Sequence, residues 1–322
     1  MSLEAIDLSS DKEIAENLRR LSVPEPTIKE LVPLVKYAAL HIRALAASRE
    51  INPQAVLNIL GHLRQAYHIR KEARAVGCTM IIGKIELLDT CLPVRSLVQP
   101  PIVTHDDLTP LIPYYDCVNE DDYAFVFNPD GALQSLRQLM TVGGGHQLTG
   151  LDLLPYITEN SDALAFSVRK EKRSIRLYAN GTLDTVILLS EKEGTWEFKR
   201  FSNSIAKISK ASGIPDKTIS RVLDIAIEMM QLGYGALFVV GDPKDTSGFG
   251  KPSITIKQTS LAFVDSRSVI DLAKQDGATC ITSSCEIAKT NFLIHNKIAQ
   301  EDIPEAYRGG ARHATAWATS RE

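Results

Sequence analysis

The chain has 322 residues, of which 44% are hydrophobic and 23% are charged, and its formal net charge is -3. This composition is typical of a soluble globular protein with room for two domains, and it argues against a nucleic-acid partner held by bulk positive charge. The five cysteines include no Cys-x-x-Cys pair, so they indicate free thiols in a reducing compartment. We find neither a signal peptide nor an apolar run long enough to span a bilayer, and we therefore expect a cytoplasmic protein without membrane contact.

The first part of the chain has the residue spacing of helices. Apolar residues recur at helical intervals after Thr27, which is a predicted N-cap. A second helix is predicted to begin at Pro53 and to run toward Arg74. Residues 79–82 then predict a short buried strand, and the proline- and aspartate-rich residues 93–113 predict a loop with short elements.

The middle of the chain predicts strands joined by turns. Asn128-Pro129-Asp130-Gly131 has the residues that a turn favours at each position. Asn180-Gly181 lies between two apolar runs and predicts a tight hairpin. The strands expected around these turns are residues 123–127, 133–140, 163–168, 174–178 and 185–189.

The order of predicted elements repeats in the last third of the chain. Pro215 begins a helix as Pro53 does, and a glycine-bounded apolar strand follows each helix. A glycine pair and a histidine then follow in each half, at His146 and at His313. Such a repeat of element order indicates one supersecondary unit present twice.

We therefore predict the α/β fold class, with two related units that each have a mixed central β-sheet flanked by helices. Residues 1–200 form the N-terminal unit, which includes the helical N-terminal segment. Residues 201–322 form the C-terminal unit, and the boundary is expected near residues 195–204.

Three segments of the C-terminal unit contain residue types suited to a metal-bound polyphosphate. An aspartate where a helix passes into a strand can hold a metal ion, and a following glycine lets a ligand approach the backbone. Arginine behind a glycine-rich turn at a helix entry is placed for phosphate oxygens, although a solvent-exposed Arg-His pair is the alternative. The segments are Gly235-Ala236-Leu237, Asp276-Gly277-Ala278 and Gly310-Ala311-Arg312-His313. Asp130-Gly131-Ala132 repeats the second tripeptide, but its turn setting predicts a solvated turn.

In this order the three segments resemble the diadenylate cyclase domain. That family has an Asp-Gly-Ala motif and a Gly-Thr-Arg-His-Arg-Ala-Ala motif at comparable separation, and the resemblance covers residues 215–322. It implies a nucleotidyltransferase that condenses two ATP molecules into the second messenger cyclic di-AMP and releases pyrophosphate. It also implies Mg²⁺ or Mn²⁺ as cofactor and a homo-oligomer in which two catalytic domains meet face to face.

The resemblance also implies a role for each matching residue. Asp276 would bind the metal ion and help to activate the ribose 3′-hydroxyl, while Arg312 and His313 would hold the triphosphate. Such a set is chemically sensible, because nucleotidyl transfer depends on positioning and charge neutralisation. The nucleotide would be bound by Gly235, Ala236, Leu237, Gly277, Ala278, Gly310, Ala311 and Thr315.

A departure from the family motif and the weaker motifs of the N-terminal unit define the alternatives. The second arginine of the family motif is Ala314 here, which removes one phosphate contact. In the N-terminal unit Asp121-Asp122-Tyr123 and Gly145-His146-Gln147 stand in place of the two motifs, which predicts a degenerate sensor or scaffold domain. The alternative to an enzyme is a catalytically inactive nucleotide-binding sensor of the same fold, and a third reading is an oligomerisation scaffold.

Overall fold

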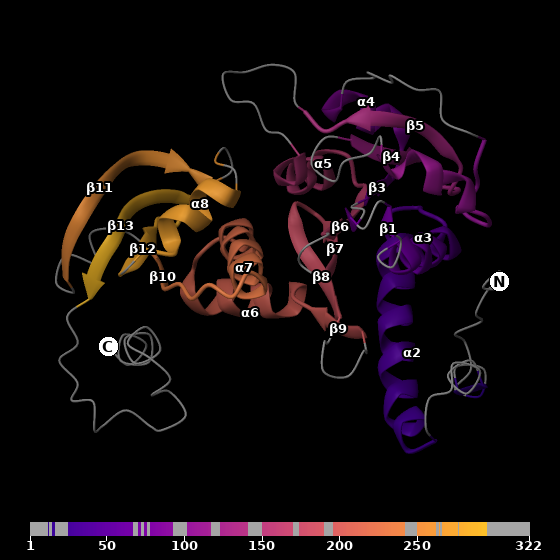
Figure 1. The fold of residues 1–322 in the computed structure, drawn as a ribbon, viewed down its shortest axis with the longest axis horizontal. Helices are drawn as coiled ribbons and strands as arrows, with labels where there is room; N and C mark the ends of the chain where they lie inside the picture. The colour runs from indigo at the N-terminus through magenta and orange to yellow at the C-terminus, as the bar shows by residue number, and fades with distance from the viewer. Residues whose placement is uncertain are drawn as a thin grey trace. The chain divides into compact units, whose positions relative to one another are not determined.

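The structure is a computed structural model, and it divides into two compact units whose elements are labelled in Figure 1. Unit 1 comprises Met1–Val142, Leu153–Gly181 and Thr185–Lys199, and unit 2 comprises Gly143–Asp152, Thr182–Asp184 and Arg200–Glu322. Both contain helices and a β-sheet, so the predicted α/β class is confirmed. The residues described are 12, 15–16, 25–66, 70–71, 74–75, 78–92, 102–116, 123–140, 150–169, 174–189, 196–241, 250–261, 264, 266–275 and 277–294. Among these residues no helix is long and apolar enough to cross a membrane.

Unit 1 is built on a seven-stranded mixed sheet with the strand order β5-β4-β3-β6-β7-β8-β9. The strands β3 and β4 are parallel, whereas β6 pairs antiparallel with β3 and β5 pairs antiparallel with β4. A separate two-stranded ladder pairs β1 (Arg70–Lys71) with β2 (Arg74–Ala75). The seven strands are β3 (Cys78–Ile82), β4 (Tyr123–Phe127), β5 (Leu133–Gln138), β6 (Leu164–Arg169), β7 (Ser174–Ala179), β8 (Thr182–Leu189) and β9 (Trp196–Arg200).

Helices cover both faces of this sheet. Alternate residues such as Met80, Phe125 and Phe166 form one apolar core together with α3, because successive side chains of a strand point to opposite faces. The intervening residues Ala165 and Ser167 are equally buried, and α5 packs on β6 and β7. The helical segments are α2 (Glu25–Ala47), α3 (Pro53–Ala66), α4 (Ile85–Cys91), η1 (Thr109–Asp116), η2 (Gly150–Leu153) and α5 (Leu154–Asn160).

The predicted hairpin between β7 and β8 is confirmed. The strands are neighbours in the sheet and are separated by Asn180 and Gly181 alone. Both residues have positive φ, +52° and +73°, as a type I′ turn requires. Asparagine and glycine adopt this backbone conformation at low cost, which explains why the sequence identified the turn.

Unit 2 is built on a four-stranded sheet with the order β10-β12-β13-β11. The strands β10 and β12 are parallel, and β13 pairs antiparallel with both β12 and β11. Apolar residues of α7 and α8 cover this sheet, among them Ile225 and Ile270, which pack with Ile281 of β12. The elements are α6 (Ser202–Ser212), α7 (Asp216–Gln231), β10 (Phe238–Val240), β11 (Gly250–Ser260), α8 (Ser266–Ala273), β12 (Ala278–Ile281) and β13 (Glu286–Ile294).

The parallel strand pairs of the two units have the same register relative to their flanking glycines. In each unit the glycine that follows the first strand donates its N–H to the last residue of the second strand. Gly83 donates to the Phe127 carbonyl at 3.1 Å, and Gly241 donates to the Ile281 carbonyl at 2.8 Å. The paired residues are Met80 with Phe125, Ile81 with Val126 and Ile82 with Phe127 in unit 1, and Phe238 with Thr279, Val239 with Cys280 and Val240 with Ile281 in unit 2.

The turn after the second strand is also alike in the two units. The side chain of Asn128 accepts the N–H of Ala132 at 2.8 Å, and the side chain of Thr282 accepts the N–H of Glu286 at 3.0 Å. The reciprocal backbone bonds, from the N–H of Asn128 and of Thr282, are present in both turns. Corresponding residues of the two turns differ in number by a constant 154 (282 − 128).

Candidate functional site

Two of the predicted site segments meet at one edge of the sheet in unit 2. Because β10 and β12 are parallel, the residues that precede or begin each strand lie at the same edge. The carbonyl of Leu237 accepts the N–H of Thr279 at 2.9 Å, which places residues 235–237 beside Gly277 and Ala278. About forty residues of sequence separate these segments, so their meeting is a consequence of the fold.

The five described site residues differ in what they offer a ligand. Ala278 is buried and packs with Leu237 in a small apolar cluster, so these two side chains support the edge. Gly235 is exposed, and Gly277 has a φ of +90°, a conformation that side chains rarely adopt. The backbone of exposed Gly235 and of partly buried Gly277 is therefore the part of this edge that a ligand can approach most closely.

The remaining predicted site residues lie outside the described residues. They include Asp276, the carboxylate expected to bind the metal ion. Within the part of the chain that the structure describes, no group of three His, Cys, Asp or Glu residues is placed to hold a metal ion. The other predicted residues outside the description are Gly310, Ala311, Arg312, His313 and Thr315.

A buried ion pair fixes the start of α8, the helix that leads toward this edge. Arg221 of α7 donates to the Asp152 carboxylate at 2.7 Å and to the Val264 carbonyl at 3.0 Å. The same carboxylate accepts the hydroxyl of Ser266, the first residue of α8, at 2.8 Å and its N–H at 3.2 Å. An acidic group at a helix N-terminus is favourable, so Asp152 both neutralises Arg221 and caps α8.

The described thiols of unit 2 are not suited to nucleophilic chemistry. Burial raises the pKa of Cys280, which lies on β12. Burial also raises the pKa of Cys285 in the turn that follows. Both thiols therefore stay protonated at neutral pH, and a thiolate mechanism is disfavoured.

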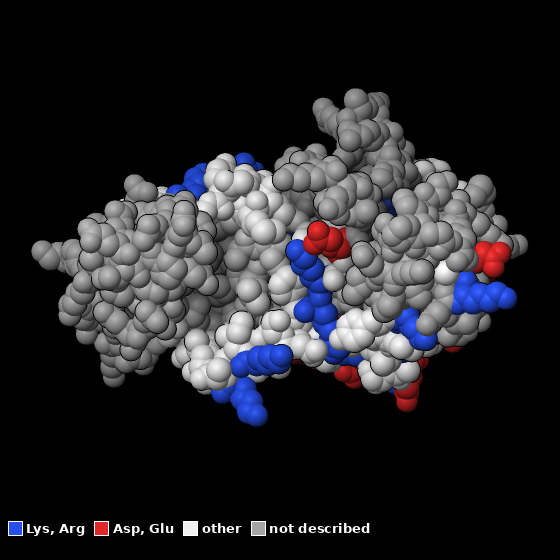
Figure 2. Space-filling view, turned by 90° about the horizontal axis from the view of Figure 1, so that it is seen from below, with Lys and Arg blue, Asp and Glu red and all other residues white. Residues whose placement is uncertain are grey.

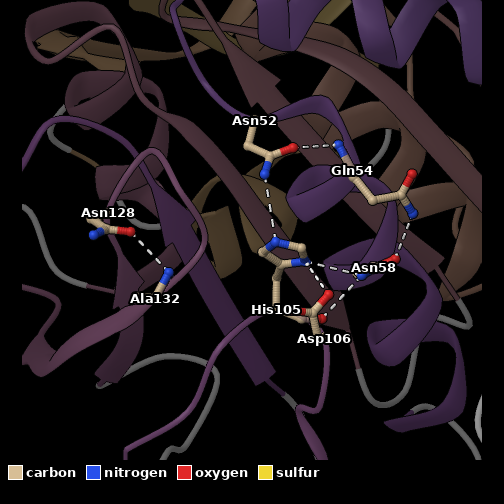
Figure 3. Close-up of polar contacts among 7 residues, drawn as sticks. All are labelled: Asn52, Gln54, Asn58, His105, Asp106, Asn128 and Ala132. Atoms are coloured by element: carbon tan, nitrogen blue, oxygen red, sulfur yellow. Dashed lines mark hydrogen bonds and ion pairs between the residues drawn. The ribbon is translucent and has the colours of Figure 1, made fainter. Parts of the chain in front are cut away.

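Unit 1 has a polar cluster beside the turn that follows β4, at the other end of its parallel strands from the end that corresponds to this edge (Figure 3). The amide of Asn58 donates to Nδ1 of His105 at 3.0 Å, and Oδ1 of Asn52 accepts the N–H of Gln54 at 2.9 Å. These contacts tie the start of α3 to the loop that carries His105. Asp130 lies in the neighbouring turn and is exposed, so the turn predicted there is confirmed.

Two side chains at the unit 2 edge were not among the predicted site residues. Tyr234 directly precedes Gly235, and Nζ of Lys274 lies 5.7 Å from the centre of its ring. Lys274 in turn stands two residues before Asp276. Position next to a predicted motif is the sequence signal that identifies them.

Charged side chains of both signs are mixed on the described surface. On the described part of the face in Figure 2, lysine and arginine side chains lie in separate groups among acidic and uncharged ones.

No protein-family model matches the chain, and none of the curated proteins matches it at a significant level. A functional assignment therefore rests on the motifs and on the geometry of the sheet edge.

Proposed function

We propose that unit 2 is a diadenylate cyclase domain that condenses two ATP molecules into cyclic di-AMP. The observation that carries this proposal is the meeting of residues 235–237 with Gly277 and Ala278 at one sheet edge. In the diadenylate cyclase domain that these segments resemble, the matching residues bind one nucleotide. They must therefore be neighbours in space. A chance match of short motifs carries no such requirement.

The reaction needs positioning and neutralisation of charge. The 3′-oxygen of each ATP attacks the α-phosphorus of the other, two P–O bonds form, and two pyrophosphates leave. Asp276 would hold Mg²⁺ or Mn²⁺, which lowers the negative charge that the attacking oxygen meets. Arg312 and His313 would bind the triphosphate oxygens. Because each product molecule needs two ATP molecules in opposite orientation, two domains must face each other in a homo-oligomer.

Unit 1 is, in this proposal, a related copy that has lost catalysis. The identical strand register and the matching turns of the two units support their relation. The constant offset of 154 places Asp122 opposite Asp276 and Tyr123 opposite Gly277. A tyrosine cannot adopt the positive φ of Gly277 without strain, so the backbone that a nucleotide would approach differs in unit 1.

A nucleotide-binding sensor without catalysis is the second candidate. The observation that favours it is Ala314, which stands where the family motif has its second arginine. Loss of one phosphate contact weakens stabilisation of the transition state more than ground-state binding when that contact tightens as charge develops. A sensor would therefore bind ATP or cyclic di-AMP and release no pyrophosphate.

The experiment that separates the two candidates measures binding and turnover on the same preparation. The full chain is incubated with ATP and either Mg²⁺ or Mn²⁺, and cyclic di-AMP is quantified by mass spectrometry. Binding of ATP and of cyclic di-AMP is measured by calorimetry. Product formation supports the cyclase, binding without product supports the sensor, and absence of both overturns the nucleotide assignment.

A further inference from the structure

We propose that Tyr234 and Lys274 form the rim of the nucleotide site in unit 2, where Tyr234 stacks on the adenine ring and Lys274 attracts the phosphates. This inference rests on the proposed function, and it names two contacts that the motif residues do not provide. Asp276, Arg312 and His313 are assigned to the metal ion and the triphosphate, and the other motif residues are aliphatic, small or hydroxylic, so they offer no aromatic surface to the base. A planar, uncharged adenine ring needs such a surface to gain affinity and orientation.

The position of Tyr234 is fixed by the way α7 ends. Gly233 has a φ of +75° and donates its N–H to the Met230 carbonyl at 3.1 Å. Tyr234 donates its N–H to the Met229 carbonyl at 2.9 Å. These two bonds form a Schellman motif, which terminates the helix in one defined conformation. The ring is therefore held directly before Gly235, at the edge where the site segments meet.

Lys274 reaches the same edge from the end of α8. Its ammonium lies 5.7 Å from the centre of the Tyr234 ring and 2.6 Å from a carboxylate oxygen of Asp271. Both members of the ion pair are about half exposed, and exposed pairs of this kind contribute little to stability. The lysine can therefore exchange the carboxylate for a phosphate at small cost, while its stem stays beside the ring.

The surface around Tyr234 is unusually apolar for an exposed helix end. Tyr234 is 47% exposed, and Met230 and Leu232 of the same segment are 59% and 38% exposed. Three large apolar side chains are thus exposed within five residues of sequence, and exposed apolar surface of this kind marks places where a ligand or a partner binds. A position beside the proposed nucleotide edge favours the adenine ring as the group that covers it.

The internal repeat provides a comparison that separates a binding role from a folding role. Counted along the sequence, the strand offset of 158 (234 − 76) pairs Tyr234 with Val76, and the turn offset of 154 (274 − 120) pairs Lys274 with Glu120; Val76 and Glu120 lie outside the described residues. Unit 1 thus has neither an aromatic ring nor a cation at these positions, although its parallel strands pair in the same register. At these sequence positions the aromatic and cationic pair is therefore specific to unit 2.

The test uses the full chain and an analogue that cannot react, α,β-methylene ATP, together with adenosine and inorganic tripolyphosphate. Binding of each to wild type, Tyr234→Ala, Tyr234→Phe and Lys274→Met is measured by calorimetry. Tyr156→Ala is the matched control, because Tyr156 is exposed to a similar extent in unit 1. Thermal unfolding of each variant shows whether the fold is kept.

We expect Tyr234→Ala to weaken binding of the ATP analogue and of adenosine about 5- to 100-fold, the range of one stacked base. Tyr234→Phe keeps the ring and should bind within about twofold of wild type. Lys274→Met should weaken the analogue and tripolyphosphate about 2- to 5-fold, as loss of one exposed charge contact does, and leave adenosine unchanged. Tyr156→Ala should change none of these values.

Different results overturn the two proposals. If wild type binds none of the three ligands, the proposed function fails. If wild type binds the analogue and folded Tyr234→Ala binds it equally well, the proposal that Tyr234 stacks on the adenine ring is overturned. The proposed function of unit 2 is not affected by that result. A change of oligomeric state in Tyr234→Ala, at unchanged nucleotide affinity, would instead assign the exposed apolar side chains at the end of α7 to a protein interface.

Discussion

The buried histidine of unit 1 makes this unit sensitive to mild acid. His62 of α3 is 7% exposed and is hydrogen-bonded to the hydroxyl of Tyr115, which is also buried. Burial lowers the pKa of His62 from 6.5 to about 4, and the charge of Asp107 offsets only a small part of this effect. The neutral imidazole is therefore the form that the folded unit accepts.

The sign and size of the effect follow from this difference in pKa. The unfolded chain binds a proton at His62 below pH 6.5, whereas the folded unit resists protonation until about pH 4. The stabilisation is fully present above pH 6.5 and is lost as the pH falls toward 4. Between pH 7 and pH 5 the free energy of unfolding should fall by about 2 kcal/mol from this group alone.

The assay compares wild type with the double variant His62→Leu/Tyr115→Phe, which removes both partners of this hydrogen bond; the Cys78 thiol, which is also hydrogen-bonded to Tyr115, loses only a weak bond, and at both pH values alike. A Trp317→Phe background leaves Trp196 of β9 as the only tryptophan, so its fluorescence reports on unit 1. Urea unfolding is measured at pH 7 and pH 5. We expect the pH-dependent loss to be about 2 kcal/mol smaller in the double variant. Equal losses in both proteins would refute the reasoning.

Two further predictions concern backbone conformation and the buried ion pair. Gly131→Ala should lower the free energy of unfolding by roughly 2–4 kcal/mol, because φ is +83° and the new Cβ would lie within 2.8 Å of two neighbouring side chains. Gly213→Ala is the control: φ is +73° but the space is open, so urea denaturation should show a loss of only about 1 kcal/mol. Arg221→Met should cost roughly 3–5 kcal/mol, because it leaves the largely buried Asp152 carboxylate with its hydrogen bonds from Ser266 but without its cation. A loss below about 1 kcal/mol in the same assay would contradict that account.

The sequence predicted best those elements that local chemistry specifies. The turn at Asn180 and Gly181 was found because only a few residue types tolerate its backbone angles. The helix α3 begins at Pro53 as expected, because proline fits the first turn of a helix. It ends at Ala66 and does not continue toward Arg74, and α2 begins at Glu25, before the predicted cap at Thr27. Helix ends depend on tertiary packing as well as on propensity, which explains both differences.

The elements and contacts that were missed depend on distant partners. The strand β11 has mostly polar residues and contains Pro252, and its structure comes from pairing with β13. The ion pair of Arg221 with Asp152 joins residues 69 positions apart, which no local pattern reveals. At the candidate site, sequence order predicted that Gly235 and Gly277 belong together. Their approach required the parallel pairing of β10 and β12, which only the structure provides.

The repeated tripeptide in this chain allows the central claim to be tested with an internal control. Asp276→Asn and Asp130→Asn make the same chemical change in two Asp-Gly-Ala segments, one predicted to be catalytic and one in an exposed turn. Cyclic di-AMP formation from ATP is measured by mass spectrometry for wild type and both variants, with Mg²⁺ and with Mn²⁺. We predict equal rates for wild type and Asp130→Asn, and a rate lower by at least about a hundredfold for Asp276→Asn. An undiminished rate in Asp276→Asn, or no product from wild type with either metal, would contradict the cyclase assignment.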